Sequence, residues 1–213
     1  MISNENSALK VAELLLQIKA IVLKPDNPFT WASGWKSPIY CDNRKTLSYP
    51  TIRTHIRQEL TEVISDKFGS PDFIAGVATG GIAQGALVAQ QLNLPFAYVR
   101  SSAKAHGMTN MIEGDIKPGQ SVVVVEDLIS TGGSSLKAVK ALREAGCVVR
   151  GMVAIFTYDF DEAKANFNEN DCELYTLSDY NYLVKTALES GYINKNQLES
   201  LTNWRNAPQK WNQ

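Results

Sequence analysis

Cysteine and histidine are scarce in this sequence, which has three cysteines and two histidines among its 213 residues. The cysteines, Cys41, Cys147 and Cys172, are far apart and form no Cys-x-x-Cys pair. This spacing excludes a cysteine zinc cluster and argues against a disulfide framework. We therefore expect a protein of a reducing compartment, the cytoplasm, in which Cys147 is simply a small buried apolar side chain.

Excess charge and long apolar runs are also missing. The formal net charge is −1, so no global basic field attracts nucleic acid or an acidic membrane. Apolar runs such as 14–16 and 122–125 are far too short to span a bilayer. The first six residues lack the basic and then apolar profile of a signal peptide. We expect neither a nucleic-acid partner nor a membrane segment.

Strand and helix patterns alternate along most of the chain. Of its residues, 44% are apolar, which suffices for one substantial core, and we expect a single domain over 1–213. The patterns predict strands at 73–78, 96–100, 121–126, 148–156 and 173–177, and helices at 81–92, 134–145 and 159–168. Further helices are predicted at 8–23, 51–68, 178–190 and 194–204, and short extended pieces at 29–31 and 38–40. This alternation predicts an α/β fold with a mostly parallel sheet flanked by helices.

The most informative stretch is 122–135, which reads VVVVEDLISTGGSS. Its β-branched start is typical of a strand buried on both faces. Glu126 and Asp127 follow at the carboxyl end of that strand, where open α/β sheets bind ligands. The small residues 130–133 form a turn before a helix, whose N-terminus offers unpaired amides and a positive dipole to an anion. The combination places acceptors for sugar hydroxyls beside donors for a phosphate.

A purely structural explanation of these residues stands beside the functional one. A strand, an acidic pair, a glycine turn and a serine N-cap are also ordinary connections between a strand and a helix. The length of the string favours function over that alternative. Other phosphate motifs do not fit, because no Gly-Lys-Ser/Thr ends a P-loop and the glycines at 80, 81 and 85 miss the dinucleotide spacing.

A second candidate region is the long loop predicted at 101–119. It carries Lys104 and His106, and Arg100 comes directly before it. Long loops inside compact domains are commonly lids, although a solvated loop with incidental charge explains the same composition. The other histidine, His55, lies in the middle of a predicted helix and is expected to be structural.

At 122–135 the chain resembles the type I phosphoribosyltransferases, which bind 5-phosphoribosyl 1-diphosphate (PRPP). The resemblance implies that Glu126 and Asp127 hold the ribose hydroxyls and that 130–134 hold the 5-phosphate. It implies catalytic roles for Lys104, His106 and Asp127. The PRPP-binding residues that it implies are Arg100, Lys104, His106, Glu126, Asp127, Leu128, Ile129, Ser130, Thr131, Gly132, Gly133 and Ser134.

Four separated motifs carry a closer resemblance, to the orotate phosphoribosyltransferases. They are FTWASGWKSP at 29–38, IYCDNR at 39–44, GVATGGI at 76–82 and RSSAKAHG at 100–107, within a likeness that covers about 25–160. The family transfers the phosphoribosyl group from PRPP to orotate in pyrimidine (UMP) biosynthesis, which gives orotidine 5′-phosphate and diphosphate. By this resemblance Ser130 also binds orotate.

The same resemblance implies an organisation, a cofactor and partners. It implies a small N-terminal hood at about 1–48 joined by the C-terminal helices, a core at about 50–180 and a mobile lid at about 101–114. Mg²⁺ is the implied cofactor, held mainly by the substrates, with no ligand directly from the protein. The implied partners are PRPP, orotate and a second copy of the chain, in a homodimer whose subunits share their lids.

The chain departs from one branch of this family, which carries cations that are missing here. That branch has lysine at position 32, a Tyr-Lys pair at 79–80 and arginine at 158, where this sequence has Ala32, Thr79, Gly80 and Tyr158. The roles of those cations cannot be transferred to this chain. Lys36 and Arg44 are candidates to replace part of the charge. A second branch of the family has the small residues found here.

Two alternatives remain open at this point. A purine or xanthine phosphoribosyltransferase shares the signature at 122–135 but needs a different hood, and the Lys-Ser-Pro at 36–38 and the lid motif count against it. A PRPP-sensing regulator on the same fold calls for a basic face or an added helix-turn-helix domain. The net charge and the length of the chain disfavour it.

Overall fold

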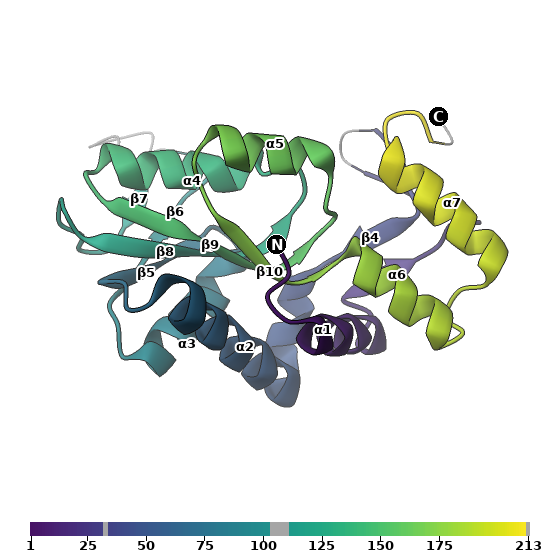
Figure 1. Cartoon of the computed structure of the whole chain (residues 1–213), viewed down its shortest axis with the longest axis horizontal. Coiled ribbons are helices and arrows are strands. Elements are labelled where there is room, and N and C mark those ends of the chain that lie inside the picture. The colour runs from purple at the N-terminus through teal and green to yellow at the C-terminus, as the bar shows by residue number, and fades with distance from the viewer. Residues whose placement is uncertain (32–33, 103–110, 212–213) are drawn as a thin grey trace.

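A six-stranded sheet with the order β10-β9-β8-β5-β6-β7 forms the centre of the molecule (Figure 1). The computed structural model describes residues 1–31, 34–102 and 111–211. Neighbouring strands are parallel except for the edge pair β6 and β7. The strands are β5 (Phe73–Val77), β6 (Phe96–Val99), β7 (Ile112–Glu113), β8 (Ser121–Ile129), β9 (Val148–Thr157) and β10 (Leu174–Asp179). The predicted α/β fold with a mostly parallel sheet is confirmed.

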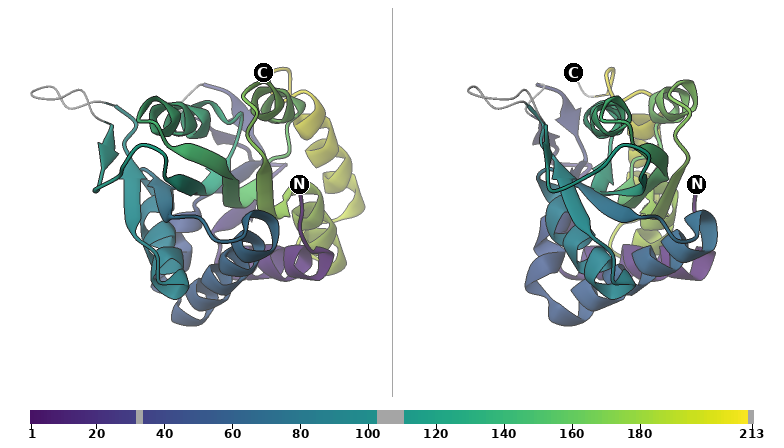
Figure 2. Two further views of the ribbon diagram at one scale, coloured as in Figure 1. Left: turned by 60° about the vertical axis from the view of Figure 1, so that its left-hand side comes forward. Right: turned by 90° about the vertical axis from the view of Figure 1, so that its left-hand side faces the viewer.

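Helices cover both faces of the sheet, and the side chains of β8 show why. Val123 and Val125 pack into one core cluster and Val122 and Val124 into another, and all four are fully buried. A strand between two helical layers needs apolar side chains in both directions, which the continuous valine run supplies. One face is covered by α1 (Glu5–Gln17), α2 (Pro50–Phe68) and α3 (Gly80–Leu92), and the other by α4 (Gly133–Glu144) and α5 (Asp161–Glu169), as the side view in Figure 2 shows.

Segments from the two ends of the chain complete the molecule beside the sheet. Two short antiparallel pairs form there: β1 (Ile21–Leu23) with β4 (Ile39–Cys41), and β2 (Phe29–Thr30) with β3 (Lys36–Ser37). A 3-10 helix, η1 (Asn43–Ser48), then leads into α2. The C-terminal helices are α6 (Tyr180–Glu189) and α7 (Lys195–Asn206).

The ring of Trp204 joins these segments to one another. Trp204 is fully buried, and its centroid lies 5.7 Å from that of Trp31, 5.8 Å from Tyr158 and 5.4 Å from Tyr180. Aromatic pairs at these separations add packing energy to the burial of their area. One aromatic cluster therefore connects α7 and α6 with the N-terminal segment and the end of β9. The division into hood, core and lid stays a prediction.

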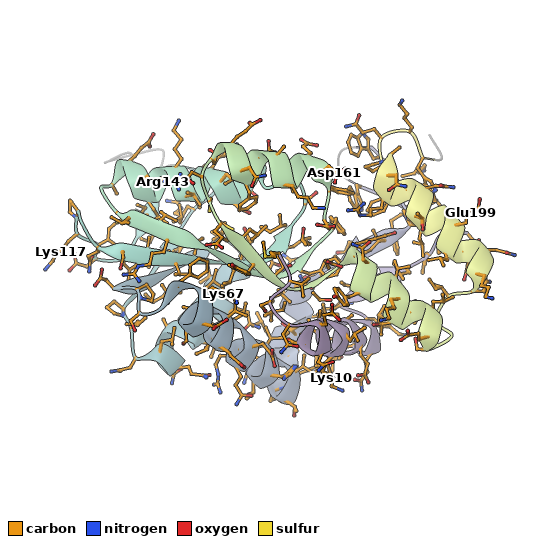
Figure 3. All side chains as sticks on the ribbon, in the orientation of Figure 1. Lys10, Lys67, Lys117, Arg143, Asp161 and Glu199 are labelled. Carbon is orange, nitrogen blue, oxygen red and sulfur yellow. The ribbon has the colours of Figure 1, made fainter. Side chains whose placement is uncertain are left out.

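Charged side chains lie mainly on the outside of the molecule. The labelled Lys10, Lys117 and Glu199 in Figure 3 are exposed and extend away from the ribbon.

Among the residues that the structure describes, no helix is both long enough and apolar enough to cross a membrane.

The first helix differs from its prediction at both ends. It begins earlier, at Glu5, because the Asn4 side chain accepts hydrogen bonds from two amides of the first turn. It ends at Gln17, and Lys19 then has a φ of 54°, outside the range of a right-handed helix. The helix predicted at 8–23 is wrong beyond its middle, because β1 leaves the helical conformation to pair with β4.

Strand lengths account for the other differences. β8 runs past the predicted end at 126, because its pairing with β9 continues through Leu128 and Ile129. β7 was not predicted, since two residues are too short to leave a periodic pattern. β1 was missed because its three residues were assigned to the helix predicted at 8–23. The remaining predicted helices and strands of the sheet layers match the structure to within two residues at each end.

Candidate functional site

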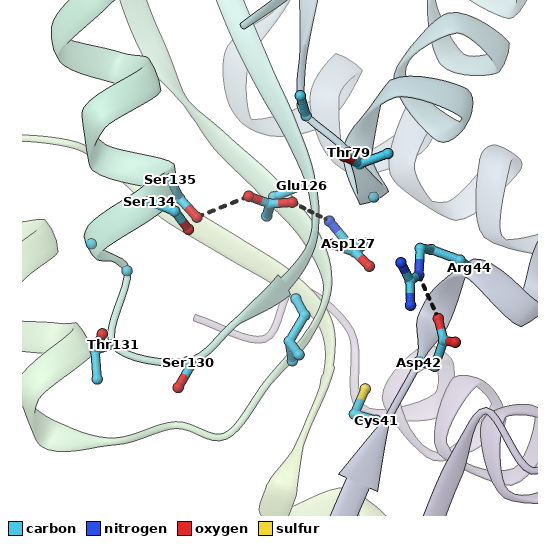
Figure 4. A pocket seen from close by; sticks show the side chains of 15 residues that line it. Cys41, Asp42, Arg44, Thr79, Glu126, Asp127, Ser130, Thr131, Ser134 and Ser135 are labelled. Atoms are coloured by element: carbon cyan, nitrogen blue, oxygen red, sulfur yellow. Dashed lines mark hydrogen bonds and ion pairs between the residues drawn. The ribbon is translucent and has the colours of Figure 1, made fainter. Parts of the chain in front are cut away.

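The candidate site lies where the direction of strand connection reverses. β5 leads through α3 to β6 on one side, and β8 leads through α4 to β9 on the other, although β5 and β8 are neighbours. The two connections diverge and leave a crevice at the carboxyl ends of these strands. A cavity of about 490 Å³ opens there (Figure 4). Its lining residues are Cys41, Asp42, Arg44, Ala78, Thr79, Gly80, Glu126, Asp127, Leu128, Ser130, Thr131, Gly132, Gly133, Ser134 and Ser135.

Glu126 is a buried acid in the wall of this cavity, with 5% of its surface exposed. Both of its carboxyl oxygens accept hydrogen bonds: Ser135 Oγ donates to Oε2 at 3.0 Å, and the Asp127 amide donates to Oε1 at 2.9 Å. Burial, with a contribution from the charge of Asp127, raises the pKa of Glu126 to about 8. The two hydrogen bonds hold the carboxyl group beside Asp127, as Figure 4 shows.

Asp127 is positioned from two other elements. Asn43 of η1 donates from Nδ2 to the Asp127 carbonyl oxygen at 2.6 Å. Gly80, at the N-terminus of α3, comes so close that a Cβ at that position would overlap the Asp127 carboxylate. This close approach requires glycine, because any larger residue would displace the acid. Burial also raises the pKa of Asp127, while the nearby Arg44 charge opposes the shift.

The turn after β8 is held from below by α5. Gly132 has a φ of 84°, and a Cβ added to it would collide with the ring of Phe167. Asn166, next to Phe167, donates from Nδ2 to the Thr131 carbonyl oxygen at 2.9 Å. α4 then begins at Gly133, and the first amides of a helix have no partner within it. The turn thus presents backbone amides at a supported helix N-terminus, an arrangement that suits an anion.

Opposite the acids, the cavity has a basic side chain. Arg44 follows β4, and its Nε donates to Asp42 Oδ1 at 2.7 Å. This hydrogen bond lowers the pKa of Asp42 and keeps its carboxylate charged. The site thus combines carboxyl groups that can bind sugar hydroxyls, a turn whose amides can bind a phosphate, and the positive charge of Arg44. This combination suits a phosphorylated sugar.

Comparison with known proteins identifies the family. The chain matches the phosphoribosyl transferase domain over residues 47–173. It is 59% identical over 201 residues to the orotate phosphoribosyltransferase of Porphyromonas gingivalis, with 94% of this chain and 96% of that protein covered. The chain belongs to the orotate phosphoribosyltransferase family. It is accordingly a pentosyl-transferring enzyme with the type I phosphoribosyltransferase fold.

Solved structures of orotate phosphoribosyltransferases share this architecture. The enzyme from Aeropyrum pernix superimposes with a TM-score of 0.75 at 27% identity, covering 86% of this chain and 99% of that one. The enzyme from Mycobacterium tuberculosis, in complex with PRPP, has a TM-score of 0.65 at 21% identity, covering 83% and 98%. The second likeness concerns the fold alone.

The structure brings most of the predicted signature residues together. Glu126, Asp127, Leu128 and residues 130–134 all line the one cavity. Ile129 does not, because its side chain alternates into the core and is fully buried. Their roles toward substrate stay predictions.

The predicted lid residues fall into two groups. Arg100 lines a neighbouring hollow that shares Ala78 and Thr79 with the main cavity, and its Nη1 lies 3.6 Å from Glu113 Oε1. Lys104 and His106 lie outside the described residues. His55, predicted to be structural, is on α2 with its Nδ1 3.8 Å from Glu59 Oε1.

The positions where one family branch carries cations, and the two cations proposed to replace them, differ in their surroundings. Tyr158 is buried among aromatic rings, and this burial raises its pKa. Lys36 donates to Thr30 Oγ1 at 2.9 Å and does not line the cavity, whereas Arg44 does. Ala32 lies outside the described residues.

Sequence reasoning assigned no role to three residues that shape the site, namely Asp42, Asn43 and Ser135. Each acts through a contact with another element or with a neighbour: Asp42 with Arg44, Asn43 with Asp127, and Ser135 with Glu126. All three lie inside the quoted motifs at 39–44 and 122–135, but their roles were missed because the sequence of a motif does not show which atoms its polar side chains contact.

Proposed function

We propose that the chain transfers the 5-phosphoribosyl group of PRPP to orotate, which gives orotidine 5′-phosphate and diphosphate in pyrimidine biosynthesis. The observation that carries the proposal is the cavity at the reversal of strand order, which joins two carboxylates to an anion-binding turn. Membership of the orotate phosphoribosyltransferase family favours orotate over a purine as the acceptor and favours an enzyme over a regulator.

We assign the roles of the residues from their places in the cavity and from the family resemblance. Glu126 and Asp127 accept hydrogen bonds from, or donate them to, the ribose hydroxyls in the middle of the cavity. The amides and hydroxyls of 130–134 hold the 5-phosphate at the start of α4. Ser130, at the near end of that turn, faces the base. Lys104 and His106 of the predicted lid, with Arg100 directly before it, contact the diphosphate.

The chemistry calls for charge stabilisation and no covalent intermediate. The bond between ribose C1 and the diphosphate oxygen breaks, the ribose gains oxocarbenium character, and a ring nitrogen of orotate attacks C1. Asp127 beneath the ribose offsets the growing positive charge. Lys104 and His106 offset the negative charge on the leaving diphosphate. Closure of the lid excludes water, which would otherwise hydrolyse PRPP.

The donor set of the cavity suits Mg²⁺ held chiefly by substrate. The described residues contain no group of three or more His, Cys, Asp or Glu side chains arranged to hold a metal. We propose that Mg²⁺ would be held mainly by oxygen atoms of the substrates, with no ligand directly from the protein. The bound ion would neutralise charge on the diphosphate.

We also propose a homodimer in which the lid of each subunit completes the site of the other, and a cytoplasmic location. The dimer is motivated by the family. The location is supported by the free thiols of Cys41, Cys147 and Cys172, which are typical of a reducing compartment.

A spectrophotometric assay tests the proposed reaction. Purified protein with PRPP and Mg²⁺ should consume orotate, seen as loss of its absorbance, and should leave adenine, hypoxanthine and uracil unchanged. Asp127→Asn should lose most of this activity while remaining folded by circular dichroism. Consumption of hypoxanthine in preference to orotate would overturn the assignment of the acceptor.

A further inference from the structure

The charges that line the cavity are unbalanced for its substrate. Among the described lining residues, Asp42, Glu126 and Asp127 carry carboxyl groups, and Arg44 is the cation. PRPP is itself strongly anionic at both ends. Asp42 keeps its negative charge because its pKa is lowered, and an anion entering beside it needs a positive partner near each phosphate group, since like charges in a half-buried cavity repel.

The two ends of the cavity differ in what they offer an anion. At one end lies the turn 130–134 with the N-terminus of α4, suited to the 5-phosphate. The acid pair lies in the middle, and Arg44 lies on the side of Asp127 away from the turn (Figure 4). With its 5-phosphate in the turn and its hydroxyls beside Asp127, a ribose would place its C1 substituent on the side of the cavity away from the turn, where Arg44 lies.

Position 80 cannot supply the charge at that side. Gly80 has no side chain, and the Asp127 carboxylate already occupies the space where a Cβ would stand. The N-terminus of α3 contributes amides there but no full charge. The formal positive charge in this part of the described cavity is therefore that of Arg44.

The side chain of Arg44 is oriented for such a contact. Its Nε donates to Asp42 Oδ1, so the bond to Asp42 does not use the two terminal nitrogens. These point toward Asp127 in Figure 4. The side chain is 58% exposed, whereas that of Asp42 is 18% exposed, so the acid is fixed and the guanidinium can reach a ligand. A guanidinium presents two parallel N–H groups to phosphate oxygens.

We propose that Arg44 binds the diphosphate of PRPP, with Asp42 as the positioning residue that aims its guanidinium into the cavity. This assignment rests on the proposed function. It makes Arg44 a determinant of affinity for the leaving group, and it gives Arg44 no contact with the 5-phosphate or with orotate.

The test compares Arg44→Gln with Lys45→Gln, a matched loss of one positive charge at the next residue. Lys45 does not line the cavity, because its Nζ donates to the Lys19 carbonyl oxygen. Calorimetry with diphosphate in the presence of Mg²⁺ should give a Kd about tenfold or more weaker for Arg44→Gln, the effect of losing one charged hydrogen-bonding partner. Lys45→Gln should bind as the wild type does.

Orotidine 5′-phosphate serves as the second probe, because it contains the phosphoribosyl group and the base but no diphosphate. Its Kd should change less than about twofold in Arg44→Gln, which also shows that the variant is folded. Arg44→Lys keeps the charge and loses the paired donors, so its diphosphate affinity should lie between those of the wild type and Arg44→Gln.

Three results would overturn the assignment. Equal diphosphate affinity in Arg44→Gln and Lys45→Gln would mean that Arg44 binds no ligand. A loss of orotidine 5′-phosphate affinity with unchanged diphosphate affinity would place Arg44 against the base. If Arg44→Gln does not fold, Arg44→Lys replaces it in the test. A diphosphate Kd equal to that of the wild type in Arg44→Lys would then show that the paired N–H groups of the guanidinium do not bind the diphosphate. The proposed function fails separately, if wild-type protein consumes no orotate.

Discussion

Glu126 shows how one buried acid makes stability depend on pH. Its pKa is raised from 4.5 to about 8 in the folded chain, so the folded state keeps a proton that the unfolded state releases. Between these two values the folded state binds more protons than the unfolded state does. The contribution of Glu126 to stability therefore falls as the pH rises through this window, and it is constant below and above it.

We predict that Glu126→Gln gains stability relative to the wild type as the pH rises from 5 to 8. The neutral amide removes the cost of charging a buried group. The unfolding free energy of the variant should therefore rise relative to that of the wild type by on the order of 1–3 kcal/mol over this pH range, and this difference is the gap to be measured. Denaturant unfolding at several pH values measures the gap. The exposed Glu199→Gln is the control and should show no such trend. A gap that stays constant with pH would contradict the prediction.

At the scale of elements, the turn between β8 and α4 depends on α5. Gly132 has a positive φ and lies against Phe167, so two separate costs oppose a side chain there. Gly133 lacks both constraints, since it has an ordinary φ and no neighbouring atom within 4 Å of an added Cβ. These adjacent glycines are a matched pair.

Gly132→Ala should lower the free energy of unfolding by about 1–3 kcal/mol and weaken PRPP binding, because the turn must shift away from the Phe167 ring. Gly133→Ala should leave stability within about 0.5 kcal/mol or raise it slightly, since alanine favours a helix start over glycine. Chemical denaturation of both variants measures the difference. Equal stabilities would show that the contact with α5 does not support the turn.

We predict that the lid at 101–114 acts mainly on the transition state. Lys104→Ala and His106→Ala should each lower kcat by about a hundredfold or more, because they offset charge that develops only as the diphosphate leaves. The Kd of orotidine 5′-phosphate should change little. Steady-state kinetics with binding controls separates the two effects. Near-normal kcat in both variants would mean that the segment is a solvated loop.

At the scale of the whole molecule, the proposed shared site gives a result that a self-contained chain cannot. Asp127→Asn and Lys104→Ala are mixed in equal amounts under conditions that exchange subunits. A mixed dimer then has one site with both lesions and one site with neither. Random exchange makes half of the dimers mixed, so activity should return to roughly a quarter of the wild type.

The control for this experiment is independent proof of subunit exchange, for example by mass spectrometry of differently tagged chains. If exchange is complete and activity stays at the level of the separate variants, each site is built within one chain. A wild-type sample taken through the same exchange procedure sets the full value.

Local sequence patterns predicted the layers of this molecule because buried strands and helices have strong local signatures. The valine run at 122–125 is typical of a strand buried on both faces, and the small residues at 130–133 are typical of a turn before a helix. The acids Glu126 and Asp127 and the turn were therefore placed together in one cavity by chain order alone. The family motifs added the reaction.

Only the tertiary structure decided the features that arise between distant segments. The first helix ends at Gln17 because β1 gains strand hydrogen bonds from β4, which lies later in the chain. Asn43 of η1 reaches the Asp127 carbonyl, and the Asp127 carboxylate fills the space above Gly80. These contacts depend on where η1, α3 and the sheet bring their atoms together, and a local pattern of residues holds no information on that distance.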